Sequence, residues 1–181
     1  MKVRIGTFNA ENLFARYKFK LVPIRKGRKI VDHRPQTPEE LATIAKDGWA
    51  VDKTMFDSFK SVDTQITALA VKETRADILG LQEVEAMDTL KKFCAIRVLS
   101  SVYKYKVLID ANDPRFIDVA LLVKKNFDIA YIRTHQFERT KNGRAYIFSR
   151  DCLEVGVQLS ANTVLPIFVN HFKSMMEGRA K

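Results

Sequence analysis

The amino-acid sequence predicts an α+β fold in which β-sheets lie in layers and helices cover them. Two segments with helical period occur early in the chain, at residues 57–75 and 88–100. Five segments with the two-residue period of strands then follow one another in the second half. Helices followed by a run of sequential strands favour layered sheets over a doubly wound parallel sheet.

The composition is that of a globular protein with one core. The chain has 181 residues, of which 46% are hydrophobic and 29% charged, and such a chain can bury the core of one domain. No apolar run approaches the roughly 18 residues that span a bilayer. The amino terminus leads directly into a strand pattern rather than into a signal peptide. We therefore expect no membrane span and a cytoplasmic location.

The net charge of +10 is the most informative bulk property. It suggests a polyanionic partner, because Lys and Arg bind phosphates partly by releasing counterions. An excess that only aids solubility is the alternative that composition leaves open. The two cysteines, Cys94 and Cys152, have no metal-site or disulfide spacing, so we expect both to be buried apolar residues.

The first third of the chain combines a strand with a long basic segment. Val3, Ile5 and Phe8 predict an opening strand. Residues 15–40 are rich in Lys and Arg, are broken by prolines and show no clean period. They predict a long basic loop, which either contacts nucleic acid or is a solvated excursion. Thr37 and Pro38 have the composition of a helix start, so a short helix is expected over residues 37–46.

The remaining elements follow from periodicity. The helix at residues 57–75 should turn an apolar stripe inward, formed by Val62, Ile66, Leu69 and Ala70. It leads into an apolar strand at residues 78–84, and a second helix is expected at residues 88–100. After it the period changes to two, and turn residues separate the expected strands, which are residues 105–109, 119–123, 129–134, 153–159 and 164–169.

Glu83 is the most conspicuous single residue, because it sits at the carboxyl end of the continuous apolar strand that begins at Ile78. Such strands are typical of sheets covered on both faces. An unpaired buried carboxylate costs several kcal/mol, so Glu83 should meet a cation, a hydrogen-bond network or water. A Glu that simply leaves the sheet and is solvated is the alternative.

Four segments place polar residues where an apolar strand ends. Each taken singly has a structural explanation, such as a turn Asn, a surface ion pair or a His at a strand end. Together their order and character resemble the endonuclease/exonuclease/phosphatase superfamily. These metal-dependent phosphohydrolases include pancreatic-type deoxyribonucleases, abasic-site endonucleases and several phosphatases. The phrases that carry the resemblance are GTFNAENLF (residues 6–14), ILGLQEV (78–84), IDVALL (117–122) and FVNHFKS (168–174).

The resemblance implies a fold and a set of functional residues. The fold is a four-layer α/β/β/α sandwich, two packed β-sheets with helices outside, in a single domain of which residues 1–181 are the N-terminal part. Glu83 is similar to the principal ligand of a divalent cation, Mg²⁺ with Mn²⁺ as an alternative, and Glu11 to a second acidic residue near it. The catalytic residues would be Asn9, His171 and Asp118, and the substrate-binding residues Asn12, Arg115, Asn170 and Lys173.

The implied activity is metal-dependent hydrolysis of phosphate esters by a nuclease. The alternatives are a phosphatase or a phosphoinositide or phospholipid phosphodiesterase of the same superfamily, and a non-catalytic basic module that binds nucleic acid or associates through unpaired sheet edges. The family's Gly-Asp-Phe-Asn and Ser-Asp-His phrases do not occur in the sequence. We therefore expect a domain that is incomplete at its C-terminus, and weak or absent hydrolysis by these residues alone.

Overall fold

The fold is described from a computed structural model. The structure describes residues 2–13, 19–23, 29–31, 49–51, 62–113 and 117–172. The chain divides into two compact units, of which the first comprises Met1–Phe14 and Asp63–Lys181 and the second Ala15–Val62. Among the described residues, no helix has both the length and the apolar character needed to cross a membrane.

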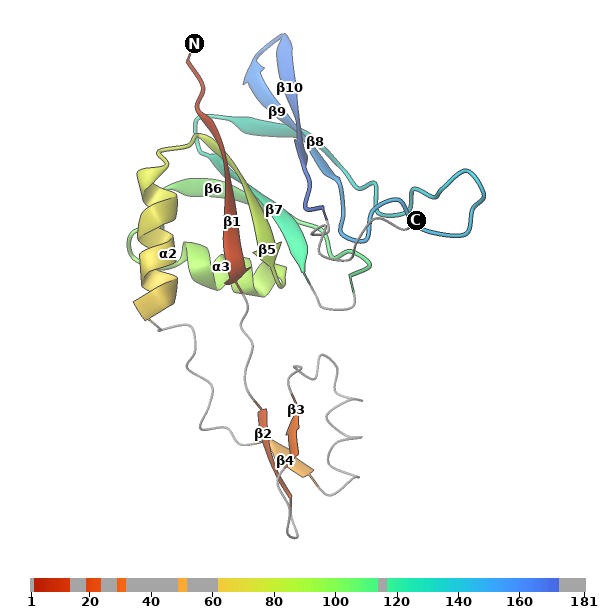
Figure 1. The fold of residues 1–181 in the computed structure, drawn as a ribbon. Helices are drawn as coiled ribbons and strands as arrows, with labels where there is room; N and C mark the ends of the chain where they lie inside the picture. Colours follow the sequence, from red (N-terminus) through yellow and green to blue (C-terminus); the bar gives the residue numbers. More distant parts are fainter. Residues whose placement is uncertain are drawn as a thin grey trace. The chain divides into compact units, whose positions relative to one another are not determined.

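The first unit contains a four-stranded sheet with the strand order β1-β5-β7-β6 (Figure 1). β1 (Ile5–Leu13) runs parallel to β5 (Ile78–Val84), and β7 (Asp118–Lys124) is antiparallel to both β5 and β6 (Tyr103–Leu108). The two central strands, β5 and β7, are the most continuously apolar, as expected for strands covered on both faces.

A second, three-stranded sheet has the order β10-β9-β8 and is antiparallel throughout. It consists of β8 (Asp128–Arg133), β9 (Leu153–Ser160) and β10 (Thr163–Val169). All five strands expected in the second half of the sequence are therefore confirmed, with ends shifted by at most two residues.

The core lies between the two sheets. One buried cluster joins residues of the first sheet, including Ile78 and Leu121, to Leu153, Val155 and Val169 of the second. Leu79 and Leu81 alternate with the cluster residues and are also fully buried, so they pack on the other face of the first sheet. The helices α2 (Val62–Glu73) and α3 (Met87–Cys94) lie beside this sheet (Figure 1). The α+β sandwich with two packed sheets is confirmed; among the described residues, no helix covers the outer face of the second sheet.

The predicted inner face of α2 was wrong. Ile66 and Leu69 are 57% and 48% exposed, whereas Ala68 and Val71 are completely buried. The helix is apolar on two neighbouring rows, so periodicity could not decide between them. The row of Ala68 and Val71 faces inward, whereas Ala70 of the predicted row is exposed. α3 is also shorter than expected, because the chain continues as turns after Cys94.

Two parts of the basic segment form strands. The second unit has a three-stranded antiparallel sheet of β2 (Phe19–Pro23), β3 (Lys29–Val31) and β4 (Trp49–Val51), in the order β3-β2-β4. The expectation of a loop throughout residues 15–40 was therefore wrong for β2 and β3. The short helix expected at residues 37–46 lies outside the described residues.

Gly156 in β9 allows a close side-chain contact across the second sheet. A Cβ at this position would overlap the ring of Tyr131, the residue opposite on β8. The Tyr131 hydroxyl donates a hydrogen bond of 2.9 Å to Glu154 Oε1, which holds the ring in place. We expect Gly156→Ala to lower the free energy of unfolding by about 1–3 kcal/mol, as overpacking does, in urea denaturation.

The matched control is the same substitution in a Tyr131→Ala background. Without the Tyr131 ring, Gly156→Ala should lower the free energy of unfolding only slightly. The double variant should therefore be less destabilised than the sum of the single variants. Additive effects would show that the Tyr131 ring is not the reason for glycine.

Candidate functional site

Glu83 occupies a β-bulge near the carboxyl end of β5, one of the two inner strands of the first sheet. Its neighbours in β5, Gln82 and Val84, pair with the adjacent residues Val119 and Asp118 of β7, so Glu83 is the extra residue on its strand. The register to β1 shifts at the same point. Glu83 has a φ of 62°, a left-handed conformation that costs a non-glycine residue about 1–3 kcal/mol. The fold thus holds this carboxylate in a conformation that ordinary strand geometry would not give.

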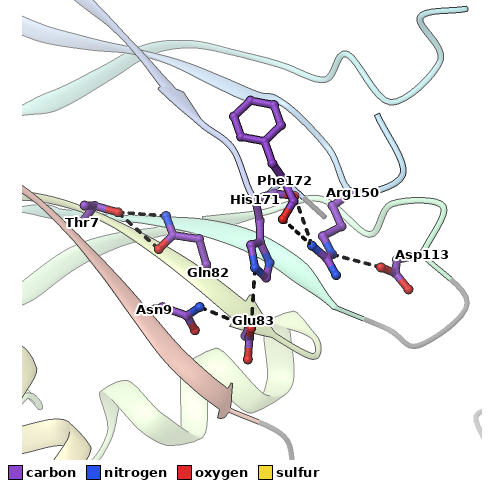
Figure 2. A network of polar contacts seen from close by, with 8 residues as sticks. All are labelled: Thr7, Asn9, Gln82, Glu83, Asp113, Arg150, His171 and Phe172. Carbon is purple, nitrogen blue, oxygen red and sulfur yellow. Dashed lines mark hydrogen bonds and ion pairs between the residues drawn. The ribbon is translucent and has the colours of Figure 1, made fainter. Parts of the chain in front are cut away.

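Two side chains from distant parts of the chain meet the same oxygen of Glu83. Asn9 Nδ2 of β1 donates a hydrogen bond of 3.2 Å to Glu83 Oε1, across 74 residues of sequence. His171 Nε2, two residues after the end of β10, lies 3.5 Å from that oxygen. Figure 2 shows Asn9 and His171 approaching Glu83 from the first and second sheets respectively. The Glu83 and His171 side chains remain 20% and 16% exposed, so the cluster is open to a ligand.

Arg150 holds the backbone that carries His171, and sequence reasoning missed it. Its Nε donates to Asp113 Oδ2 at 3.0 Å, and its Nη1 donates to the carbonyl oxygens of His171 and Phe172, both at 3.2 Å (Figure 2). Both charged side chains are almost completely buried, with 6% and 2% exposed. A lone Arg ahead of an apolar strand has no periodic signal, so only the packed structure reveals this pair.

Of the other predicted site residues, the structure describes the side chains of some and not of others. Asn170 directly precedes His171, and its Oδ1 is buried without a hydrogen-bond partner among the described residues. Glu11 and Asn12 lie in β1 beside the register shift, but their side chains are outside the described part. Arg115 and Lys173 also lie outside the described residues. Asp118 is at the start of β7, and its Oδ1 accepts a hydrogen bond of 3.1 Å from the Ala111 backbone.

A pocket of about 310 Å³ adjoins His171. Its walls are two segments, residues 146–151 and 170–172, so Arg150 and His171 both line it. A volume of this size is at the lower end of small-molecule sites. The pocket therefore offers room for a ligand beside the Glu83 cluster.

Comparison with known proteins identifies the family of the chain. The model of the Endonuclease/Exonuclease/phosphatase family matches residues 29–181. The chain belongs to this family. Two solved structures of TDP2 from Caenorhabditis elegans, one of a truncated form and one of the selenomethionine protein, are similar at 24% and 25% identity, with TM-scores of 0.44 and 0.43. Each match covers 63% of this chain but only 40% and 30% of those chains, so the chain spans less than half of their length. No curated protein matches.

The donor atoms of the Glu83 cluster fit a hard cation. Among the described residues, no three or more His, Cys, Asp or Glu side chains gather in a metal-binding group. Mg²⁺ does not need such a group, since it keeps several waters and binds through one or two carboxylates together with substrate phosphates. Glu83 offers one partly exposed carboxylate of this kind, with the Asn9 amide beside it.

Neither cysteine is one of the residues that meet at Glu83. Both are buried and free, as the sequence predicts. Burial raises the pKa of Cys94 to about 11, so its thiol stays protonated at neutral pH and is a poor nucleophile.

Asp118 makes stability depend on pH. Burial raises its pKa from 3.8 to about 7, the nearby charges of Asp110, Asp113 and Asp151 add to the rise, and the hydrogen bond from Ala111 opposes it. Between these two pH values the folded chain binds more protons at Asp118 than the unfolded chain does. Stability from this group is thus fully present below about pH 4 and is lost as pH rises toward 7.

We expect Asp118→Asn to remove this loss. The variant should gain stability relative to the parent chain as pH rises from 4 to 8, by a few kcal/mol at most, because one pKa unit corresponds to about 1.4 kcal/mol. Urea denaturation of both chains across this range measures the difference, in which the other titrating groups cancel. A difference that does not change with pH would show that Asp118 is ionised normally.

Proposed function

We propose that this chain is part of a divalent-cation-dependent phosphodiesterase that cleaves nucleic acid. The observation that carries the proposal is the meeting of Asn9, Glu83 and His171 at one carboxylate oxygen. Residues 1–181 belong, in this proposal, to a single catalytic domain. The family match starts at residue 29, but β1 pairs with β5 inside the match, which makes the first residues part of the same sheet.

Each residue of the cluster has a chemical role in this proposal. Glu83 holds Mg²⁺, or Mn²⁺ as an alternative, and Asn9 fixes the orientation of its carboxylate. The bound cation would polarise the phosphoryl group and offset negative charge during attack by water. His171 donates a hydrogen bond or a proton to the phosphate or the leaving group. Arg150 keeps the His171 backbone in place from behind.

Nucleic acid is the substrate class that the charge favours. A net charge of +10 attracts a polymer of phosphates more strongly than a small ester with one phosphate, because each neutralised phosphate releases counterions. Phosphomonoesters, inositol phosphates and phospholipids contain the same reacting group. The test therefore compares nucleic acids with these other phosphate esters.

Relaxation of supercoiled plasmid DNA tests the proposal, because one cleaved bond converts a whole molecule. We expect slow relaxation in Mg²⁺ or Mn²⁺ that stops when EDTA is added. RNA and single-stranded DNA are tested in parallel with inositol phosphates and sphingomyelin. Cleavage that continues in EDTA, or faster turnover of a non-nucleic substrate, would each contradict the proposal.

A further inference from the structure

The segment between β8 and β9 forms a hairpin that the proposed catalytic cluster does not use. Residues 137–147, called the arm below, extend away from the two sheets (Figure 1). Backbone hydrogen bonds join its two limbs, Ile147 N to Glu138 O at 2.8 Å and Thr140 N to Ala145 O at 2.9 Å. Gly143 closes the turn with a φ of 68°. The arm is therefore a defined structure rather than an irregular loop.

The arm presents cations and aromatic surface together. Every residue of the arm is exposed, including Arg139, Lys141 and Arg144, and Glu138 is its one acidic residue. The Arg139 guanidinium lies 4.3 Å from the centre of the Tyr146 ring, and its Nη2 donates a hydrogen bond of 2.9 Å to the Tyr146 hydroxyl. Phe137 is 66% exposed. Planar rings beside guanidinium groups are surfaces on which unpaired bases stack.

The base of the arm is fixed next to the catalytic cluster. Asp151 Oδ1 accepts a hydrogen bond of 2.8 Å from the backbone of His135, just before the arm, and Asn112 Nδ2 donates one of 2.9 Å to Gln136 O. The returning limb, with Tyr146 and Ile147, then forms one wall of the 310 Å³ pocket whose other wall includes His171. The pocket thus connects the arm to the residue that contacts Glu83.

We propose that the arm binds a single strand of nucleic acid and that the pocket receives the nucleotide next to the phosphate held at Glu83. This inference rests on the proposed function and deepens it by naming the form of the substrate. Three cations on the arm match the repeating charge of a phosphate backbone. Exposed rings favour unpaired bases, whose faces are accessible, over a duplex, whose bases are already stacked. A membrane surface fits less well, because the end of the arm, residues 140–144, is polar and basic and would have to enter the lipid.

Fluorescence anisotropy with a labelled 12-nucleotide single strand tests the inference. All titrations contain EDTA, so binding is measured without hydrolysis, and a failure of the proposed catalysis leaves this result readable. The arm variant is Arg139→Gln/Lys141→Gln/Arg144→Gln. Its matched control, Lys91→Gln/Arg97→Gln/Lys125→Gln, removes the same charge from exposed positions outside the arm. Thermal unfolding confirms that each variant is folded.

We expect the arm variant to lose affinity at least tenfold more than the control. Its plot of log affinity against log salt should be shallower by about 2, since each phosphate contact on a single strand contributes about 0.7. Tyr146→Ala, which leaves the charge unchanged, should weaken binding roughly 5- to 100-fold, as loss of one stacked base does. Equal losses in the arm variant and the control, tighter binding of a duplex of the same sequence, or preferential binding to phosphatidylserine vesicles would overturn the inference.

Discussion

Replacing Arg150 by methionine is expected to lower the free energy of unfolding by about 3–5 kcal/mol. Methionine keeps much of the length of the side chain but removes its charge and its hydrogen bonds. Asp113 would then remain buried without the guanidinium that faces it at 3.0 Å, and removing one partner of a buried ion pair has a cost of this size. The carbonyl oxygens of His171 and Phe172 would also lose a donor. Urea denaturation at pH 7 measures the change.

A double variant separates the ion pair from ordinary packing. Asp113→Asn removes the charge that faces Arg150, so the double variant should be less destabilised than the sum of the two single variants by more than about 1 kcal/mol. Arg150→Lys is the conservative comparison. It keeps the charge but not the planar fork that reaches both Asp113 and the two carbonyl oxygens, so it should fall between the parent chain and Arg150→Met. A loss below about 1 kcal/mol for Arg150→Met would show that the pair contributes little.

The strands were predictable because their signals are local. A continuous apolar run identified β5 as a buried strand, and the two-residue period identified β6 to β10, since each pattern depends only on residues next to one another in sequence. The inner face of α2 was not predictable, because two rows of the helix are apolar and only the packed sheet selects between Ala68 and Ile66. Likewise β2 and β3 have too few residues to show a period.

Some features of the candidate site could likewise be predicted from the sequence, and others could not. The phrases around Asn9, Glu83 and His171 could be recognised, and the structure brings these three side chains together. Two features could not be read from the sequence. The left-handed conformation of Glu83 arises from the register that β5 makes with both of its neighbours. The pair of Arg150 with Asp113 joins residues 37 positions apart that belong to no common pattern.

Glu83→Gln is expected to weaken Mn²⁺ binding at least about 100-fold and to reduce plasmid relaxation to the level of the EDTA control. The amide keeps the size of the side chain but removes its charge, and even residues that only support a metal ligand are worth 10- to 100-fold in metal affinity or activity. The electron paramagnetic resonance signal of free Mn²⁺ measures binding directly. Glu73→Gln, an exposed acidic position on α2, is the matched control and should bind Mn²⁺ like the parent chain.

Because Glu83 has a positive φ, a second substitution, Glu83→Gly, can distinguish a functional from a structural role of this residue. Glycine adopts positive φ without a steric penalty, so Glu83→Gly should be more stable than Glu83→Gln by about 1 kcal/mol, because it relieves backbone strain at a φ of 62°. Neither variant should bind Mn²⁺. If the carboxylate were instead present for its contacts with Asn9 and His171, glycine would be the less stable of the two. If Glu83→Gly is the more stable variant and neither variant binds Mn²⁺, the backbone strain at Glu83 is explained by its role as a metal ligand.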